Sequence, residues 1–406
     1  MPTSLKEKYC IVGVGETEYS QASGRTTRAM GVEVVKKAMD DAGLKASDVD
    51  GIVCYHSNDS TPTTLIAGTL GIRPNFYLDV TGGGGTSGGL VTTALAAMEA
   101  GLCKTVAVFR SMNGYSQTRI GGTGPRAAAP ITGEGVMTRP YGYMSPAQSF
   151  AFTFMRHLYE FGTKPSQVAM VKVVHTRHAS NNPKAFLKKR VTVDEVLNSR
   201  WIVKPVHLLD CCLETDNATC IIVAPAERAR SLRQKPIYIM GGSGPVNKLG
   251  GQDLHYQHGP ITRVQGYYVK DIVFPMAGVT PEDIDVTGSY DAFTWTTLLQ
   301  LEDYGFCKKG EGGDYVSSGI IELGGKRPNN TSGGQLCEGY THGINLVIEL
   351  TRQLRGQVDD YCPGWREGKH TYDYSEGHCR AVKDPEIGMF MGWGSPGAGN
   401  SLILRR

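Results

Sequence analysis

The sequence AGLKASDVD at residues 42–50 recurs in the same frame as AGVTPEDID at residues 277–285. Each copy follows a segment with helical periodicity and precedes a segment typical of a buried strand. A glycine-rich loop at 81–89 also has a counterpart at 332–343, and a helical stretch follows each loop. Two matches in the same order indicate a duplicated unit of alternating strands and helices.

The duplicated unit sets the domain organisation that we expect. A charged stretch at 226–236, with a helical pattern of its own, separates the copies and predicts an N-terminal half at 1–230 and a C-terminal half at 231–406. Residues 113–205 interrupt the first half with further helical patterns, including one at 146–159. We expect this insertion to cap the functional site, because long insertions in α/β enzymes often carry or cover it. A packing role for the insertion is compatible with that expectation.

Local patterns predict individual elements of the first half. The apolar run at 9–14 predicts a buried strand. The periodicity at 27–41 predicts a helix that ends at Gly43, a residue type common just after helices. Two more strands are expected at 50–55 and 105–109.

The composition is that of an ordinary globular protein. The 406 residues are 40% hydrophobic and 20% charged, with a formal net charge of +3. There is no basic block, so we expect no nucleic-acid partner. No apolar run approaches the roughly 18 residues of a membrane-spanning helix, and the N-terminal residues lack the apolar core of a signal peptide. We therefore expect a cytoplasmic protein that does not bind membranes.

The ten cysteines are spread irregularly, which is typical of reduced thiols rather than of a disulfide scaffold. Cys362, His370, His378 and Cys379 are close in sequence and could each bind a metal ion. Their spacing matches no compact zinc pattern, so we expect no metal site.

The glycine loop at 81–89, TGGGGTSGG, resembles the loop that carries the nucleophilic cysteine of thiolases, but it contains no cysteine. In the thiolase pattern the cysteine stands two positions before a Ser-Gly pair, and here that position is Gly85. Three further segments resemble the sterol-carrier-protein-X thiolase-like branch: NNPKA at 181–185, LLDCC at 208–212 and NATCIIV at 217–223. The resemblance covers nearly the whole chain. It implies a thiolase fold of the α/β class, with duplicated βαβ halves in a five-layered αβαβα arrangement.

The chain departs from thiolases at the catalytic positions. Besides the change at Gly85, Tyr290 in YDAF at 290–293 replaces the asparagine of an Asn-Glu-Ala-Phe motif, and Tyr340 replaces the histidine of a Gly-His-Pro motif. The second thiolase cysteine falls on Gly392, at the start of the segment GWG. This pattern resembles the lipid-transfer-protein-type retro-aldolases, which shorten steroid side chains carried as coenzyme A thioesters. In that group two tyrosines are the proposed catalytic residues.

The resemblance implies retro-aldol cleavage of a β-hydroxyacyl-CoA to a ketone or aldehyde plus a short acyl-CoA, such as propionyl-CoA or acetyl-CoA. This reaction requires a base for the β-hydroxyl group and hydrogen-bond donors for the thioester oxyanion. We expect one of Tyr290 and Tyr340 to be the base and the other to protonate the enolate or hold the oxyanion. The sequence does not distinguish the two roles. Backbone N–H groups near Gly85 and Gly394 are the expected oxyanion donors.

Two neighbours of the tyrosines are further catalytic candidates. A phenol titrates near about 10 in water, so a tyrosinate requires nearby positive charge or hydrogen-bond donors. His342, two residues after Tyr340, is a candidate for that neighbour, although it could equally bond a backbone carbonyl. Asp291 would orient Tyr290 rather than activate it, because a carboxylate raises the pKa of a nearby phenol. Capping of a loop is the alternative role for Asp291.

Two other functions stay open. Cys337 lies in the same loop as Tyr340 and could act as a displaced nucleophile, which would preserve thiolase activity and require free coenzyme A. The chain could also be a non-catalytic protein that binds acyl-CoA or lipid. The resemblance further implies a homodimer and a separate partner protein with a zinc ribbon and an OB-fold domain. It implies no cofactor other than the coenzyme A of the substrate.

Overall fold

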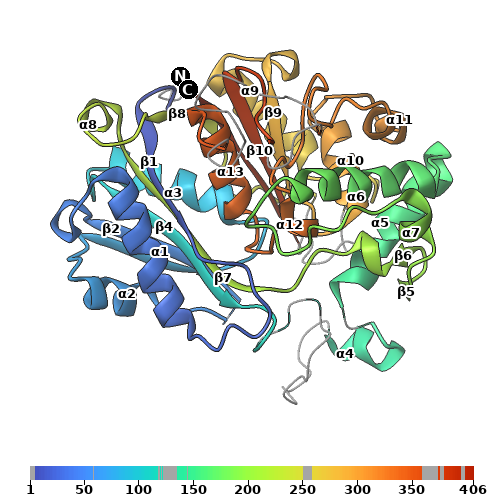
Figure 1. Ribbon diagram of the computed structural model, residues 1–406, viewed down its shortest axis with the longest axis horizontal. Helices are drawn as coiled ribbons and strands as arrows, with labels where there is room; N and C mark the ends of the chain where they lie inside the picture. The colour runs from blue at the N-terminus through green and yellow to red at the C-terminus, as the bar shows by residue number, and fades with distance from the viewer. Residues whose placement is uncertain are drawn as a thin grey trace.

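The computed structural model describes residues 5–57, 59–117, 119, 121, 135–143, 145–249, 258–358, 374, 379–394 and 398–406. Its largest sheet has nine strands in the order β3-β2-β4-β7-β1-β8-β11-β10-β9 (Figure 1). The strands of the first half are β1 (Tyr9–Glu16), β2 (Gly51–His56), β3 (Phe76–Thr81), β4 (Val106–Asn113) and β7 (Asp216–Pro225). Those of the second half are β8 (Ile237–Gly242), β9 (Val286–Ser289), β10 (Ile387–Gly394) and β11 (Ala398–Arg405).

The two halves of the sheet have the same topology. From the outer edge inward, the first half has β3-β2-β4-β7-β1 and the second has β9-β10-β11-β8. An isolated parallel bridge between Thr287 and Asn329 stands where the second half would have its outermost strand. Inward of the outermost position, β2 pairs with β4 and β9 pairs with β10 in parallel, and the next two pairs of each half are antiparallel. The halves join where β1 pairs with β8, so the duplicated unit predicted from the sequence is present in the sheet.

The sequence repeat at 42–50 and 277–285 forms the same local structure twice. Helix α1 (Thr27–Ala42) ends before Gly43 with φ of 74°, and helix α9 (Gly266–Ala277) ends before Gly278 with φ of 69°. Left-handed backbone favours glycine at both positions. In the turn that follows, Asp48 and Asp283 each accept a hydrogen bond at 2.8 Å from the backbone N–H three residues earlier. Each capped turn then leads into a strand, β2 or β9.

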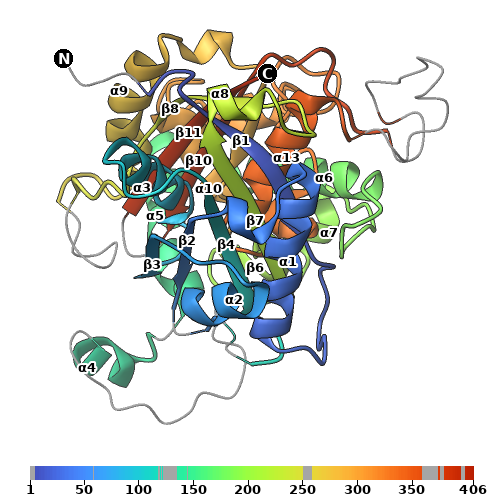
Figure 2. The ribbon, with the colours of Figure 1, turned by 90° about the vertical axis from the view of Figure 1, so that its left-hand side faces the viewer.

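The helices lie in layers on the two half-sheets (Figures 1 and 2). Helices α1 and α2 (Thr63–Leu70) cover the outer face of the first half with side chains such as Val34 and Ile66. Helices α3 (Ser87–Glu99) and α13 (Ile344–Arg355) fill the space between the two halves. Helices α9 and α10 (Thr294–Asp303) cover the outer face of the second half. The order is therefore helix, sheet, helix, sheet, helix, which is the five-layered αβαβα arrangement that was predicted.

The insertion packs on the second half, although it interrupts the first. Its described helices are α4 (Gly135–Thr138), α5 (Pro146–Phe161), α6 (Pro165–Ser180) and α7 (Val193–Leu197), followed by the short strands β5 (Trp201–Val203) and β6 (Val206–His207). Helix α6 contacts α10 and α11 (Gly312–Ser317). The rings of Phe154 on α5 and Trp295 on α10 stack at 4.6 Å, and Phe150 meets Trp393 of β10 at 4.9 Å. The insertion thus lies beside the end of β10 that carries Gly394, while the division of the chain at residue 230 stays a prediction.

The structure bears on the expectations about membrane-spanning helices, a metal site and reduced cysteines. No helix among the described residues is long and apolar enough to cross a membrane. The described residues also contain no group of three or more His, Cys, Asp or Glu side chains placed to hold a metal ion. Cys362, His370 and His378 lie outside the described residues. Cys379 is disulfide-bonded, so the expectation of reduced thiols was wrong for this residue.

Candidate active site

The two tyrosines predicted from motif positions form a hydrogen-bonded pair. Tyr290 follows the end of β9, and Tyr340 follows the short helix α12 (Gly334–Cys337). Both side chains are buried, and their phenolic oxygens are 2.6 Å apart. The two rings are 6.4 Å apart, with an angle of 62° between their planes. Tyr290 and Tyr340 are 50 positions apart in the sequence, and one hydrogen bond joins their hydroxyl groups.

The glycine loop lies directly under Tyr290. A β-carbon at Gly84 would overlap Cε2 and Cζ of Tyr290 and lie 2.6 Å from Cδ2. Asn400 on β11 holds this loop, because its Oδ1 accepts from the backbone N–H of Gly88 at 2.8 Å and its Nδ2 donates to the carbonyl of Gly84 at 3.0 Å. The ring of Tyr290 thus packs directly on Gly84, where there is no room for a side chain.

Gly85 and Gly394, the expected sources of backbone donors, are neighbours in space. A β-carbon at Gly394 would lie 2.6 Å from the backbone nitrogen of Gly85. A β-carbon at Gly85 would lie 2.8 Å from both Cβ and the carbonyl oxygen of Ala398. A cysteine at position 85 would therefore not fit this backbone. The role of the two glycines as oxyanion donors stays a prediction.

Side chains on or next to two buried strands of the first half fix the loop of Tyr340. The side-chain amide of Asn217 on β7 donates to the carbonyl of Tyr340 at 2.9 Å, and the hydroxyl of Thr215 accepts from its N–H at 3.0 Å. The phenol of Tyr55 on β2 donates to the carbonyl of Thr341 at 2.8 Å. These contacts tie the loop of the second half to the sheet of the first half.

His342 lies beside Tyr340 but does not supply positive charge. Its ring centre is 4.8 Å from that of Tyr340, and its Nδ1 is 3.4 Å from both Nε and Nη2 of Arg110. Burial and the charge of Arg110 lower the pKa of His342 to about 3, so the imidazole is neutral at neutral pH. The sequence placed His342 next to the tyrosine correctly, but the cation at this site is Arg110.

Arg110 is a charged residue of the candidate site that the sequence analysis missed. Its side chain extends from the middle of β4 and is fully buried, with Nη2 2.5 Å from Oδ2 of Asp59 and the guanidinium carbon 5.6 Å from the centre of the Tyr55 ring. An arginine buried this deeply requires a paired anion, because desolvation of an unpaired charge is costly. The available signal was one charged residue inside the otherwise uncharged strand Val106–Asn113.

Both phenols are protonated at neutral pH when no ligand is bound. Burial raises the pKa of Tyr290 and of Tyr340 above the usual value of about 10. The hydrogen bond from Tyr340 and the charge of Arg110 act in the opposite direction on the pKa of Tyr290. Every cause acting on Tyr340 raises its pKa, so Tyr290 is the phenol of the pair whose anion is less disfavoured.

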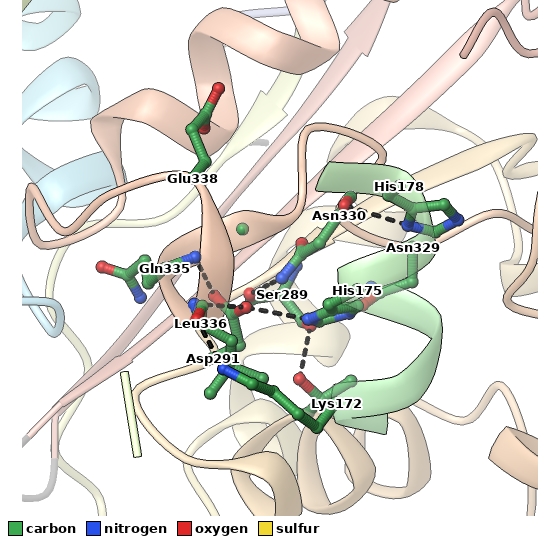
Figure 3. Close-up of polar contacts among 12 residues, drawn as sticks. Lys172, His175, His178, Ser289, Asp291, Asn329, Asn330, Gln335, Leu336 and Glu338 are labelled. Carbon is green, nitrogen blue, oxygen red and sulfur yellow. Dashed lines mark hydrogen bonds and ion pairs between the residues drawn. The ribbon is translucent and has the colours of Figure 1, made fainter. Parts of the chain in front are cut away.

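Asp291 has the contacts of a loop cap (Figure 3). Its carboxylate accepts hydrogen bonds from the backbone N–H groups of Gln335 at 2.9 Å and Leu336 at 3.3 Å, both on α12. The same carboxylate lies 3.0 Å from Nδ1 of His175 on α6. These contacts match the alternative role stated for Asp291. Because α12 leads directly to Tyr340, the cap also connects the segments of the two tyrosines.

The cysteines near the site do not have the properties of a nucleophile. Burial raises the pKa of Cys337 to about 11 and raises the pKa of Cys212 well above its usual range. A cysteine attacks as the thiolate, and both side chains are in the unreactive neutral thiol form at neutral pH. The displaced-nucleophile hypothesis therefore finds no activated thiol at Cys337.

Comparisons with known proteins identify the family of the chain. A family profile described as "Thiolase C-terminal domain-like" matches residues 269–363. The "17-hydroxy-3-oxo-4-pregnene-20-carboxyl-CoA lyase" of Mycobacterium tuberculosis is 37% identical to this chain and aligns with 87% of it and 92% of the relative. The chain belongs to the thiolase superfamily, in its sterol-carrier-protein-type branch.

Two further similarities support the assignment of this thiolase-like protein. The "Steroid side-chain-cleaving aldolase" of Thermomonospora curvata is 37% identical, over 85% of this chain and 90% of the relative. The solved structure of the "Ltp2-ChsH2(DUF35) aldolase" matches over 99% of each chain, with 32% identity and a TM-score of 0.86. The resemblance stated from motifs and the predicted fold class are both confirmed.

Proposed function

We propose that this protein is a carbon–carbon lyase that cleaves a β-hydroxyacyl-CoA by a retro-aldol reaction. The observation that carries the proposal is the pair of phenols 2.6 Å apart, packed on a glycine loop that has no cysteine. Without an acyl-accepting thiol, the bond between the α and β carbons breaks from a β-hydroxyl rather than a β-ketone. Two relatives at 37% identity are named as a lyase and an aldolase, which supports the same reaction class.

In the active form the tyrosine pair has lost one proton. The phenolate of Tyr290, hydrogen bonded to Tyr340, takes the proton of the β-hydroxyl group. The β-carbonyl forms, the Cα–Cβ bond breaks, and its electron pair becomes the enolate of the thioester. Tyr340 then protonates the α carbon to give the short acyl-CoA. A proton passes from Tyr290 to Tyr340 along their hydrogen bond and restores the starting state.

The substrate that we propose is a steroid side-chain thioester, cleaved to a ketone or aldehyde and propionyl-CoA or acetyl-CoA. The names of the two relatives support this choice, since both refer to steroids. Coenzyme A enters as part of the substrate, with no further cofactor. Gly85 and Gly394 contribute backbone donors to the thioester oxygen, and the insertion at 113–205 limits access.

We further propose that the chain acts as a cytoplasmic homodimer with a separate partner protein that carries a zinc ribbon and an OB-fold domain. The name of the similar solved structure, "Ltp2-ChsH2(DUF35) aldolase", supports a partner of this kind. This chain aligns with 99% of the matched chain, so the partner's domains are expected on a different chain.

Mass spectrometry of products tests the proposed reaction. The protein, with and without its partner, is incubated with a tertiary β-hydroxyacyl-CoA and no free coenzyme A. We expect equal amounts of a ketone and a short acyl-CoA. Turnover only with a β-ketoacyl-CoA and added coenzyme A would instead establish a thiolase, and binding without any turnover would establish a ligand-binding protein.

A further inference from the structure

The proton of the His342 imidazole is placed by Arg110. Nε and Nη2 of Arg110 each lie 3.4 Å from Nδ1 of His342. A guanidinium group has donors and no acceptor, so Nδ1 can only accept in this contact. A neutral imidazole whose Nδ1 accepts carries its single proton on Nε2.

Arg110 is itself held in a fixed position. Its Nη2 pairs with Oδ2 of Asp59 at 2.5 Å, and its Nη1 donates to the carbonyl of Ser111 at 3.1 Å. Asp59 accepts from the backbone N–H of Ser57 at 2.9 Å. The guanidinium is fully buried, so it cannot turn toward solvent and release the imidazole. Its charge also disfavours a second proton on His342, in line with the lowered pKa of that ring.

The N–H edge of His342 faces the glycine loop. A β-carbon at Gly83 would lie 3.2 Å from Cδ2 and 3.3 Å from Nε2 of His342. The ring of Tyr290 packs against Gly84, the next residue of that loop. His342 also has φ of 58°, a left-handed conformation that is uncommon for residues other than glycine and that clusters at functional sites. The imidazole donor and the tyrosine pair therefore converge on one loop.

We propose that His342 is a catalytic hydrogen-bond donor to the thioester oxygen, and that Arg110 and Asp59 are positioning residues that hold its Nε2–H tautomer. The proposal rests on the proposed function. As the Cα–Cβ bond breaks, its electron pair moves into the thioester and negative charge develops on the carbonyl oxygen. Nε2–H donates to that oxygen without giving up its proton. Tyr340 supplies the proton that the α carbon takes.

The groups around the imidazole are compatible with a neutral donor. Arg110 on β4 and Asp59 after β2 face it as an ion pair of no net charge. Tyr55 on β2, with its ring 6.2 Å from that of His342, and Tyr340 on the same loop have pKa values that burial raises. No group in this set drives protonation of His342 near neutral pH.

Nitrogen NMR of protein labelled with ¹⁵N-histidine tests the tautomer without any substrate. The His342 signals are assigned by their loss in His342→Asn. We expect a protonated Nε2 and an unprotonated Nδ1, unchanged from pH 8 to pH 5. In the Arg110→Met/Asp59→Asn double variant we expect a mixture of tautomers, with a His342 pKa that stays below its usual value because burial of the ring remains. A protonated Nδ1 in wild type, or an unchanged tautomer in the double variant, would overturn the positioning role.

Two substitutions of His342 test the donor role. Gln places an amide N–H near the position of Nε2, whereas Asn is too short but tolerates the left-handed backbone. For His342→Asn we expect kcat to fall by about 10²–10³-fold with little change in KM, as for loss of one oxyanion donor. For His342→Gln we expect at least about tenfold more activity than for His342→Asn.

The outcomes separate the two proposals. Wild-type kcat in His342→Asn, in a protein that cleaves the β-hydroxyacyl-CoA, would overturn the donor role alone. A wild-type protein with the Nε2–H tautomer but no retro-aldol turnover would overturn the proposed function and the donor role together, and would leave the assignment of the tautomer standing.

Discussion

Replacing Gly84 by alanine tests whether the glycine loop and Tyr290 act as one unit. The added β-carbon would lie 2.6 Å from Cδ2 of Tyr290 and overlap two other ring atoms. Carbon atoms in contact are separated by about 3.5–4.0 Å, so the ring must move by about 1 Å or more. That movement breaks or lengthens the hydrogen bond of 2.6 Å to Tyr340.

For Gly84→Ala we expect kcat/KM for retro-aldol cleavage to fall by about 100-fold, because a misplacement of about 1 Å has an effect of that size. The free energy of unfolding should fall by about 1–3 kcal/mol, as for other overpacked cores. Product formation and urea unfolding measure the two effects. Gly68→Ala on α2 is the control, because a β-carbon there meets no atom within 4 Å. Wild-type kcat/KM in Gly84→Ala would refute the reasoning.

Three further predictions concern the groups around the tyrosines. Burial raises the pKa of Tyr290 and Tyr340, and the pair acts after losing one proton. In a pH–rate profile, kcat/KM should therefore rise by up to about tenfold per pH unit and should not level off below pH 9. A plateau below pH 8 would contradict this. Asp291→Asn places an amide donor against the backbone donors of α12, so the free energy of unfolding measured in urea should fall by about 1–3 kcal/mol. The fall in kcat should be larger than the rise in KM. Unchanged stability and kinetics would exclude the capping role. Glu338 is the buried residue directly after α12, and burial raises its pKa to about 8. Its contribution to the free energy of unfolding is therefore full below about pH 4 and falls as pH rises to about 8. Glu338→Gln should lose less stability than wild type between pH 6 and 8 in urea unfolding, and an equal loss would contradict the raised pKa.

The sequence was sufficient for the fold because the informative signals were local. The repeat at 42–50 and 277–285 predicts the turn chemistry that both copies show, and Gly43 marks the end of α1 as expected. Tyr290 and Tyr340 were found because motif positions in a duplicated fold specify where loops meet. Their contact across 50 residues follows from topology rather than from any pattern between them.

The features that the sequence did not reveal depend on contacts between distant segments. Arg110 lies in a strand, and nothing nearby in sequence indicates that it meets His342, 232 residues away. The neutral state of His342 follows from that contact and from burial. The stretch at 226–236 was predicted to be helical, but its only described helix is α8 (Ala226–Ala229). Arg228 and Arg233 instead donate to the carbonyls of residues 48 and 40, which holds the rest of the stretch against the first half.

The central claim is that phenols, and no thiol, perform the cleavage. The most direct test compares kcat for retro-aldol turnover in Tyr290→Phe and Tyr340→Phe with that in Cys212→Ala and Cys337→Ala, after confirming that each variant is folded. We predict a fall of at least about 10²-fold in both phenylalanine variants, as for loss of a general acid or base, and near wild-type kcat in both alanine variants. Full activity without either phenol, or loss of activity in Cys337→Ala, would contradict the account.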